Sequence, residues 1–151
     1  MNLASSASAW RGSEYYRENK VLTCEKLNET SFKGMVSGSN HSSYDVLIDL
    51  EHPRKSKCNC PHANGKRIIC KHMVALYFSA FPEEAENYYN QVVKAAEEEE
   101  QRQETLENAL IDRISKMNKE ELQQALLQLL FDGPEWQYER FLRENVDEYW
   151  E

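Results

Sequence analysis

The chain has 151 residues, a formal net charge of −8, charged side chains at 29 % of positions and hydrophobic ones at 40 %. This length suits one compact domain or two small ones. No apolar run approaches the roughly 18 residues of a membrane helix, and the first residues lack the basic and apolar blocks of a secretory signal. We therefore expect a cytoplasmic protein without membrane contact.

The charge is distributed unevenly along the chain. Residues 1–82 hold eleven Lys and Arg against seven Asp and Glu, whereas residues 83–151 hold seven against nineteen. Residues 52–82 contain six basic residues and no acidic one. This basic island consists of Arg54, Lys55, Lys57, Lys66, Arg67 and Lys71. Such a division is compatible with nucleic-acid contact at the basic end, and equally with attraction between the two halves or with a solvated basic loop.

The first part of the chain predicts a small mixed module. Residues 1–9 are rich in serine and alanine and are expected to form a flexible N-terminus. The stretch WRGSEYYRENKV, which begins at Trp10, predicts a short helix followed by the entry to a strand. Apolar and aromatic side chains at every second position of residues 44–50, and again at 32–36, predict a β-hairpin. Glycine, serine and asparagine at 38–40 supply its turn.

The second part predicts helices. The stretch CKHMVALYFSAF suits a short buried helix, and Pro82 with two glutamates after it suits the start of another. Residues 83–117 predict a long charged helix or helical linker, either continuous or broken at the polar stretch EEEEQRQE. Asn118 with Glu121 forms a capping box. We expect residues 118–151 to form a C-terminal helical hairpin, with a break at Gly133-Pro134.

The chemistry of the chain is concentrated between Cys58 and His72, in the order Cys58-x-Cys60, nine residues, Cys70-x-His72. Three thiolates and one imidazole are a normal ligand set for a closed tetrahedral zinc site. The alternative is a chance grouping of reduced thiols in the core. His62 is a candidate substitute ligand, although a solvent-facing loop histidine is the simpler interpretation.

The spacing of this cluster makes a geometric prediction. Residues two apart on an extended segment face the same side, so Cys58 and Cys60 can reach one ion from a strand or its end. Residues two apart within a helix diverge by about 200°. We therefore expect Cys70 just before a helix and His72 in its first turn. Cys24 has no cysteine nearby and is predicted to be a small buried residue.

The Cys-x-Cys and Cys-x-His pairs resemble those of the SWIM zinc finger. Pro61 follows the first pair and the apolar helix MVALYF follows CKH, as in that family. The stretches RGSEYYRENKV and YDVLIDL also resemble bacterial SWIM proteins, so the resemblance covers about residues 10–82. It implies one structural Zn²⁺ in a strand, hairpin and helix module proposed to bind DNA or proteins. We predict an α+β fold, with a SWIM-like zinc module at residues 10–82 and helices after it.

We expect no catalysis, because four protein ligands close a zinc site and no phosphate-cradling glycine loop or nucleophile motif is present. A small-molecule substrate is not expected either. Two functions from different classes are left open. The basic island can contact DNA weakly and without sequence preference, or the acidic C-terminal helices can bind a protein partner without nucleic-acid contact. Salt dependence of binding separates the two, because phosphate contacts are strongly salt-sensitive.

Overall fold

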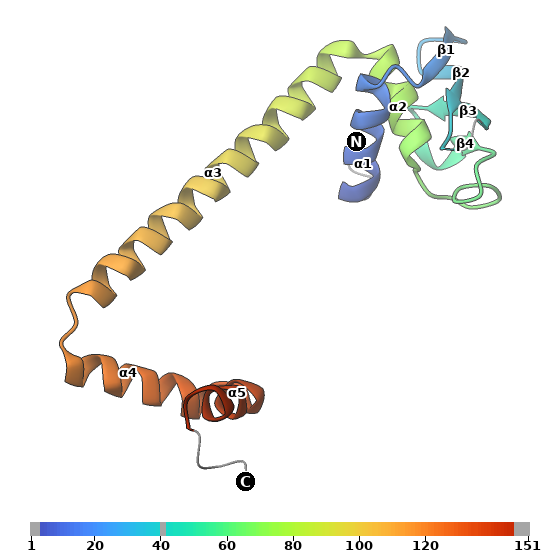
Figure 1. The fold of residues 1–151 in the computed structure, drawn as a ribbon. Coiled ribbons are helices and arrows are strands. Elements are labelled where there is room, and N and C mark those ends of the chain that lie inside the picture. The colour runs from blue at the N-terminus through green and yellow to red at the C-terminus, as the bar shows by residue number, and fades with distance from the viewer. Residues whose placement is uncertain (1–3, 40–41, 147–151) are drawn as a thin grey trace. The chain divides into compact units, whose positions relative to one another are not determined.

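The computed structural model describes residues 4–39 and 42–146, and it shows an α+β fold (Figure 1). Two compact units follow one another along the chain, Met1–Ala96 and Glu97–Glu151. The first unit contains the whole sheet and the cysteine cluster. Within the described residues, no helix has both the length and the apolar character needed to cross a membrane.

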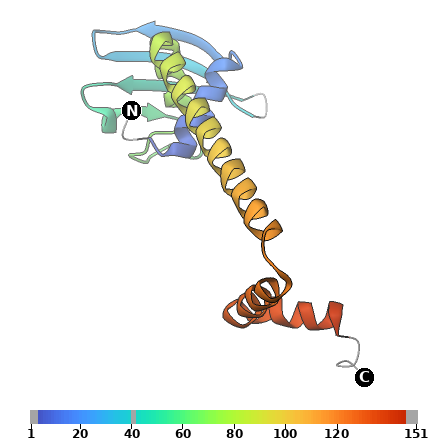
Figure 2. The same ribbon diagram turned by 90° about the vertical axis from the view of Figure 1, so that its left-hand side faces the viewer.

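The sheet has four antiparallel strands in the order β1-β2-β3-β4, which lie side by side in Figure 2. Their bounds are β1 Val21–Lys26, β2 Ser31–Ser37, β3 Ser43–Asp49 and β4 Lys57–Cys58. A short 3-10 turn, η1 Pro53–Lys55, precedes β4. The predicted hairpin is confirmed as β2 and β3, since Val36 pairs with Tyr44 and Gly34 with Val46. The turn residues 40 and 41 lie outside the described part.

One face of the sheet is covered by helix α2, Lys71–Ala80. Strands β2 and β3 bury alternate side chains on this face, as their period of two predicted. Gly34 lies where the helix approaches the sheet closely, because a Cβ there would come within 2.5 Å of the Leu76 side chain. The apolar core therefore lies between α2 and the sheet. Its buried members from these elements include Phe32, Val36, Val46, Ile48, Met73, Ala75 and Leu76.

Helix α1, Ser6–Arg17, packs on α2. The first unit therefore includes residues on the N-terminal side of the predicted start at residue 10. Helix α1 begins four residues before Trp10, because the Ser5 hydroxyl accepts the amide proton of Ser8 and caps the helix. The contact with α2 is close at Gly12, where a Cβ would lie 2.4 Å from the Val74 Cβ. The expected flexible segment 1–9 is thus helical from Ser6, while residues 1–3 lie outside the described part.

Helix α3, Pro82–Ser115, is continuous across the polar stretch EEEEQRQE, so of the two alternatives that the sequence left open the unbroken helix is correct. Its first turns belong to the first unit, because Ala85 is buried and Tyr89 stacks on Trp10 with ring centroids 6.3 Å apart. Arg17 also lies over the Tyr89 ring, 3.6 Å from its centroid. The compact unit consequently continues to Ala96 rather than ending at Pro82.

The second unit holds the rest of α3 with α4, Lys119–Asp132, and α5, Glu135–Asn145. The predicted capping box is present, since the Asn118 side chain accepts from the Glu121 amide and Glu121 accepts from the Asn118 amide. Between α4 and α5, Phe131 and Tyr138 lie with ring centroids 6.1 Å apart. The end of the expected hairpin, 147–151, lies outside the described residues.

Candidate metal centre

The four predicted metal ligands come together from three neighbouring segments. Strand β4 places Cys58 opposite Val46, and Cys60 follows two residues later in a bend just after the strand end. Cys70 is the N-cap of α2 with an extended backbone, and His72 lies in the first turn of that helix. This is the arrangement that the spacing of the two pairs predicts.

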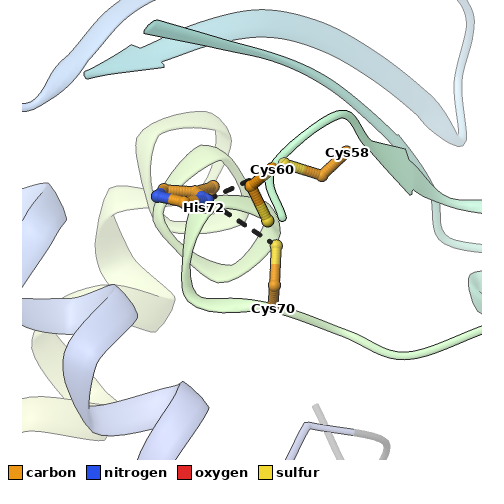
Figure 3. A group of neighbouring side chains, drawn as sticks. All are labelled: Cys58, Cys60, Cys70 and His72. Atoms are coloured by element: carbon orange, nitrogen blue, oxygen red, sulfur yellow. Dashed lines mark hydrogen bonds between the residues drawn. The ribbon is translucent and has the colours of Figure 1, made fainter. Parts of the chain in front are cut away.

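The four side chains form one buried group (Figure 3). All of their candidate ligand atoms lie within 4.8 Å of one another. The His72 Nδ1 atom is 3.7 Å from the Cys58 Sγ and 3.9 Å from the Cys70 Sγ. Each of the four residues is at most 4 % exposed, with Cys70 fully buried.

These distances fit a tetrahedral zinc ion. Zn–S bonds of about 2.3 Å and Zn–N bonds of about 2.0–2.1 Å place neighbouring ligand atoms of a tetrahedron about 3.5–3.8 Å apart. The spacing between the histidine nitrogen and the two sulfurs is close to that range. Because all four positions are supplied by the protein, the arrangement suits one structural Zn²⁺ ion, bound by Cys58, Cys60, Cys70 and His72.

The surroundings of Cys70 favour its thiolate form. A hydrogen bond from the Cys58 thiol lowers the pKa of Cys70 to about 4, against the opposing effect of burial. The imidazole of His72 and the amides of Met73 and His72 act in the same direction, as expected for a sulfur at a helix N-terminus. The same hydrogen bond to Cys70 raises the pKa of Cys58, together with burial. These shifts favour Cys70 over Cys58 as the thiolate of the pair, and a zinc ion would keep all three sulfurs deprotonated.

Residues 44–81 match the family model of the SWIM zinc finger. This chain contains a SWIM zinc finger. The SWIM match spans β3, β4, the metal ligands and α2, whereas α1, β1 and β2 pack against these elements outside the matched range. No curated protein and no solved structure matches the chain.

His62 lies outside the group of ligands. It is exposed in the loop of the SWIM finger between Cys60 and Cys70, and the group of four metal-binding side chains found among the described residues does not include it. The simpler interpretation of His62, a solvent-facing loop histidine, agrees with this position.

Cys24 is exposed, and the prediction that it is a small buried residue was wrong. It lies on β1, an edge strand of the sheet, and the side chains after Val21 on this strand are exposed on both faces. The sequence pattern around Cys24 did not show that β1 would be an edge strand. Substitution of Cys24 is therefore a suitable control for substitutions at the three buried cysteines.

The basic island divides between two concave surfaces that share no lining residue. Five of its six residues line a groove of about 1030 Å³ beside the loop Ala63–Arg67. The sixth, Lys71, lines a different pocket at the start of α2 and donates a hydrogen bond to the Tyr15 hydroxyl at 2.5 Å. Two further basic residues were missed in the sequence, Lys33 in the groove and Arg11 in the pocket. Only the pairing of β2 with β3 and the packing of α1 on α2 bring them there.

Proposed function

We propose that this chain is a non-catalytic accessory protein whose SWIM finger binds the phosphate backbone of nucleic acid. The observation that carries the proposal is the gathering of six basic side chains around one groove beside the zinc site. Its basic residues are Lys33, Arg54, Lys55, Lys57, Lys66 and Arg67, and all of them are exposed. We call this surface the basic groove.

The balance of charge in the basic groove favours an anion. Two carboxylates, Asp45 and Asp49, also line it. Both have neighbours of their own, since Asn59 donates to Asp45 at 3.4 Å and the His52 amide donates to Asp49 at 2.7 Å. Six cations therefore face two acids that are already hydrogen-bonded, which suits contact with several phosphates at once.

The side chains of the groove favour backbone contact over base recognition. None of its lining residues is aromatic, and stacking on aromatic rings is the usual way in which proteins hold single-stranded bases. Lysine and arginine contacts to phosphates carry no sequence information directly. We expect weak, sequence-tolerant binding with a dissociation constant of about 10⁻⁴ to 10⁻⁶ M at physiological salt.

The closed ligand set supports a structural rather than a catalytic role for the zinc. A catalytic zinc keeps one position open for water or substrate. Here four buried side chains are available to one ion. The metal would then act by fixing the loop that carries Lys66 and Arg67 against β4, without taking part in a reaction.

The test is a binding titration of the zinc-loaded chain with duplex DNA across several salt concentrations. If about four groove cations contact phosphate, log affinity should fall with log salt at a slope of roughly −3.6. The double variant Lys66→Glu/Arg67→Glu should reduce the slope to about −1.8. Its matched control is Arg113→Glu/Lys119→Glu, which changes the net charge equally on helices of the second unit.

A shortened chain ending at Ala96 should bind more tightly than the full chain, because it lacks most of the acidic residues of the second half. The cut belongs at Ala96 because Ala85 and Tyr89 pack within the first unit. Absence of binding by this zinc-loaded fragment at about 50 mM salt, where phosphate contacts are strong, would refute the nucleic-acid proposal.

A second function is favoured by the exposed apolar side chains of the second unit. Leu106, Leu110 and Ile111 of α3 are 58–64 % exposed, and Phe131 of α4 is 68 % exposed. Exposed apolar surface of this kind is typical of protein interaction sites. A protein adaptor would bind through these helices with an affinity that barely responds to salt, and the groove variants would leave that binding unchanged.

A further inference from the structure

We propose that the pocket between the first turn of α1 and the start of α2 binds a phosphate group. This phosphate pocket has a volume of about 430 Å³ and shares no lining residue with the basic groove. None of its lining residues is acidic. The proposal rests on the zinc-loaded fold and is independent of nucleic-acid binding in the groove.

Two cations line the phosphate pocket without a carboxylate partner. Arg11 is exposed and Lys71 is half-buried. Within the described residues, neither forms an ion pair with an acidic side chain. Lys71 donates one hydrogen bond to the Tyr15 hydroxyl, and an ammonium group can donate three. Both side chains can therefore still donate to an anion.

The N-terminus of α1 adds backbone donors to the same pocket. The Ser5 side chain caps the amide of Ser8 at 3.2 Å, and the Ala9 amide reaches the Ser5 carbonyl. The amides of Ser6 and Ala7 precede the first helical carbonyl acceptor, so they need a partner outside the helix. This end of a helix of 12 residues carries partial positive charge and is a favourable place for an anion.

The second ring nitrogen of His72 is an independent indication of a ligand. Nδ1 faces the cysteine sulfurs, and Figure 3 shows the other nitrogen on the far edge of the ring. With a metal on Nδ1, the neutral imidazole carries its proton on Nε2. This Nε2 is buried and finds no hydrogen-bond partner among the described residues, although His72 lines the pocket and is only 4 % exposed.

A phosphate oxygen is the acceptor that these donors lack. Metal-bound histidines nearly always donate the second N–H to a carboxylate, a carbonyl or a water, and the lining of this pocket contains no carboxylate. Zinc with three thiolates and a neutral imidazole carries a formal charge of −1, which opposes an anion nearby. Arg11, Lys71 and the α1 terminus together outweigh it. The phosphate can be inorganic or the terminal phosphate of a nucleic-acid strand.

The test is a titration of the zinc-loaded full chain with inorganic phosphate. NMR monitors the signals of the backbone amides and of the His72 Nε2–H during the titration. We expect saturable shifts at Ser6, Ala7 and the histidine proton. Arg11→Gln should weaken phosphate affinity by about tenfold or more, since charge-assisted hydrogen bonds are strong. Lys55→Gln, in the basic groove, is the matched control and should change it less than about twofold. Shifts that do not saturate, or that are the same in Arg11→Gln, would overturn the proposal.

Oligonucleotides with and without a 5′-phosphate then separate the two sources. Tighter binding of the phosphorylated strand, lost in Arg11→Gln, identifies a strand terminus as the ligand. Equal binding of both strands, together with saturable inorganic phosphate binding, identifies free phosphate. The variant Lys66→Glu/Arg67→Glu should weaken duplex binding and leave phosphate binding unchanged, so the two sites can be tested separately. If phosphate binds saturably but the amide signals of Ser6 and Ala7 do not shift, the anion lies elsewhere and the pocket proposal is refuted.

Discussion

Removal of one zinc ligand, Cys60→Ala, should unfold the first unit. Cys60 is 2 % exposed and belongs to the same core cluster as Val46 and Leu76. Deleting its thiol alone would cost a few kcal/mol, of order 1–3, as other small losses in a core do. Loss of the ion is larger, because a structural zinc contributes about 10–16 kcal/mol in finger peptides.

Whether loss of the ion unfolds the first unit depends on the stability expected for a unit of this length. Domains are stable by roughly 0.05–0.15 kcal/mol per residue, which for a unit of this length is about 5–14 kcal/mol. The zinc contribution is therefore comparable to the whole stability of the unit. The strand that carries Cys58 is only two residues long, so the backbone pairing of β4 cannot replace the metal. We expect the variant to lose zinc and its cooperative thermal transition together.

Cys24→Ala is the matched control, since the exposed Cys24 lies on an edge strand. It should keep stoichiometric zinc by elemental analysis and an unchanged melting temperature. Hydrogen exchange should show lost protection in β2, β3 and α2 of Cys60→Ala, with α4 unaffected because it belongs to the second unit. Stoichiometric zinc in Cys60→Ala, or a zinc-free variant that still melts as the wild type does, would refute the structural role of the ion.

Two further changes test the ligand set and the helix packing. His72→Ala should abolish the four-ligand site, with the cobalt-substituted protein losing its tetrahedral spectrum, while His62→Ala should leave that spectrum unaltered because His62 is exposed. Gly12→Ala should lower stability by about 1–3 kcal/mol through overpacking, since its Cβ would lie 2.4 Å from the Val74 Cβ. A higher melting temperature in Gly12→Ala, from its better helix propensity, would show that α1 can move away from α2 at little cost.

The metal site could be predicted from the sequence because its information is local. Two pairs of ligands, each spaced by two residues, fix which pair lies on extended chain and which lies at a helix start. The structure has Cys70 as the N-cap and His72 in the first turn of α2. The alternation of β2 and β3 was equally local, and so was the capping box at Asn118. In each case a few neighbouring residues contain the whole pattern.

Features that depend on pairing between distant segments could not be predicted in the same way. Lys33 joins the basic groove only because β2 pairs with β3, and Arg11 reaches the phosphate pocket only because α1 packs on α2. The continuity of α3, which the sequence left open, has a local explanation. Its polar stretch consists of good helix formers, and Arg102 pairs with Glu99 one turn earlier.

The basic groove and the zinc site form one cooperative structure. Lys57 lies on β4 beside one ligand, while Lys66 and Arg67 lie in the loop between Cys60 and Cys70. The metal ties both ends of that loop to the strand and to the helix start, while the loop's own backbone contacts among the described residues are short turns after Cys60 and one bridge from Ile69 to Ala4. Chelation should therefore abolish duplex binding, even though no ligand side chain touches the nucleic acid in this proposal. Zinc returned to the chelated protein should restore both the fold and the affinity. Duplex binding that survives in the zinc-free chain with an unchanged salt slope would show that the cations act as an unstructured basic segment, and the groove would then have no part in recognition.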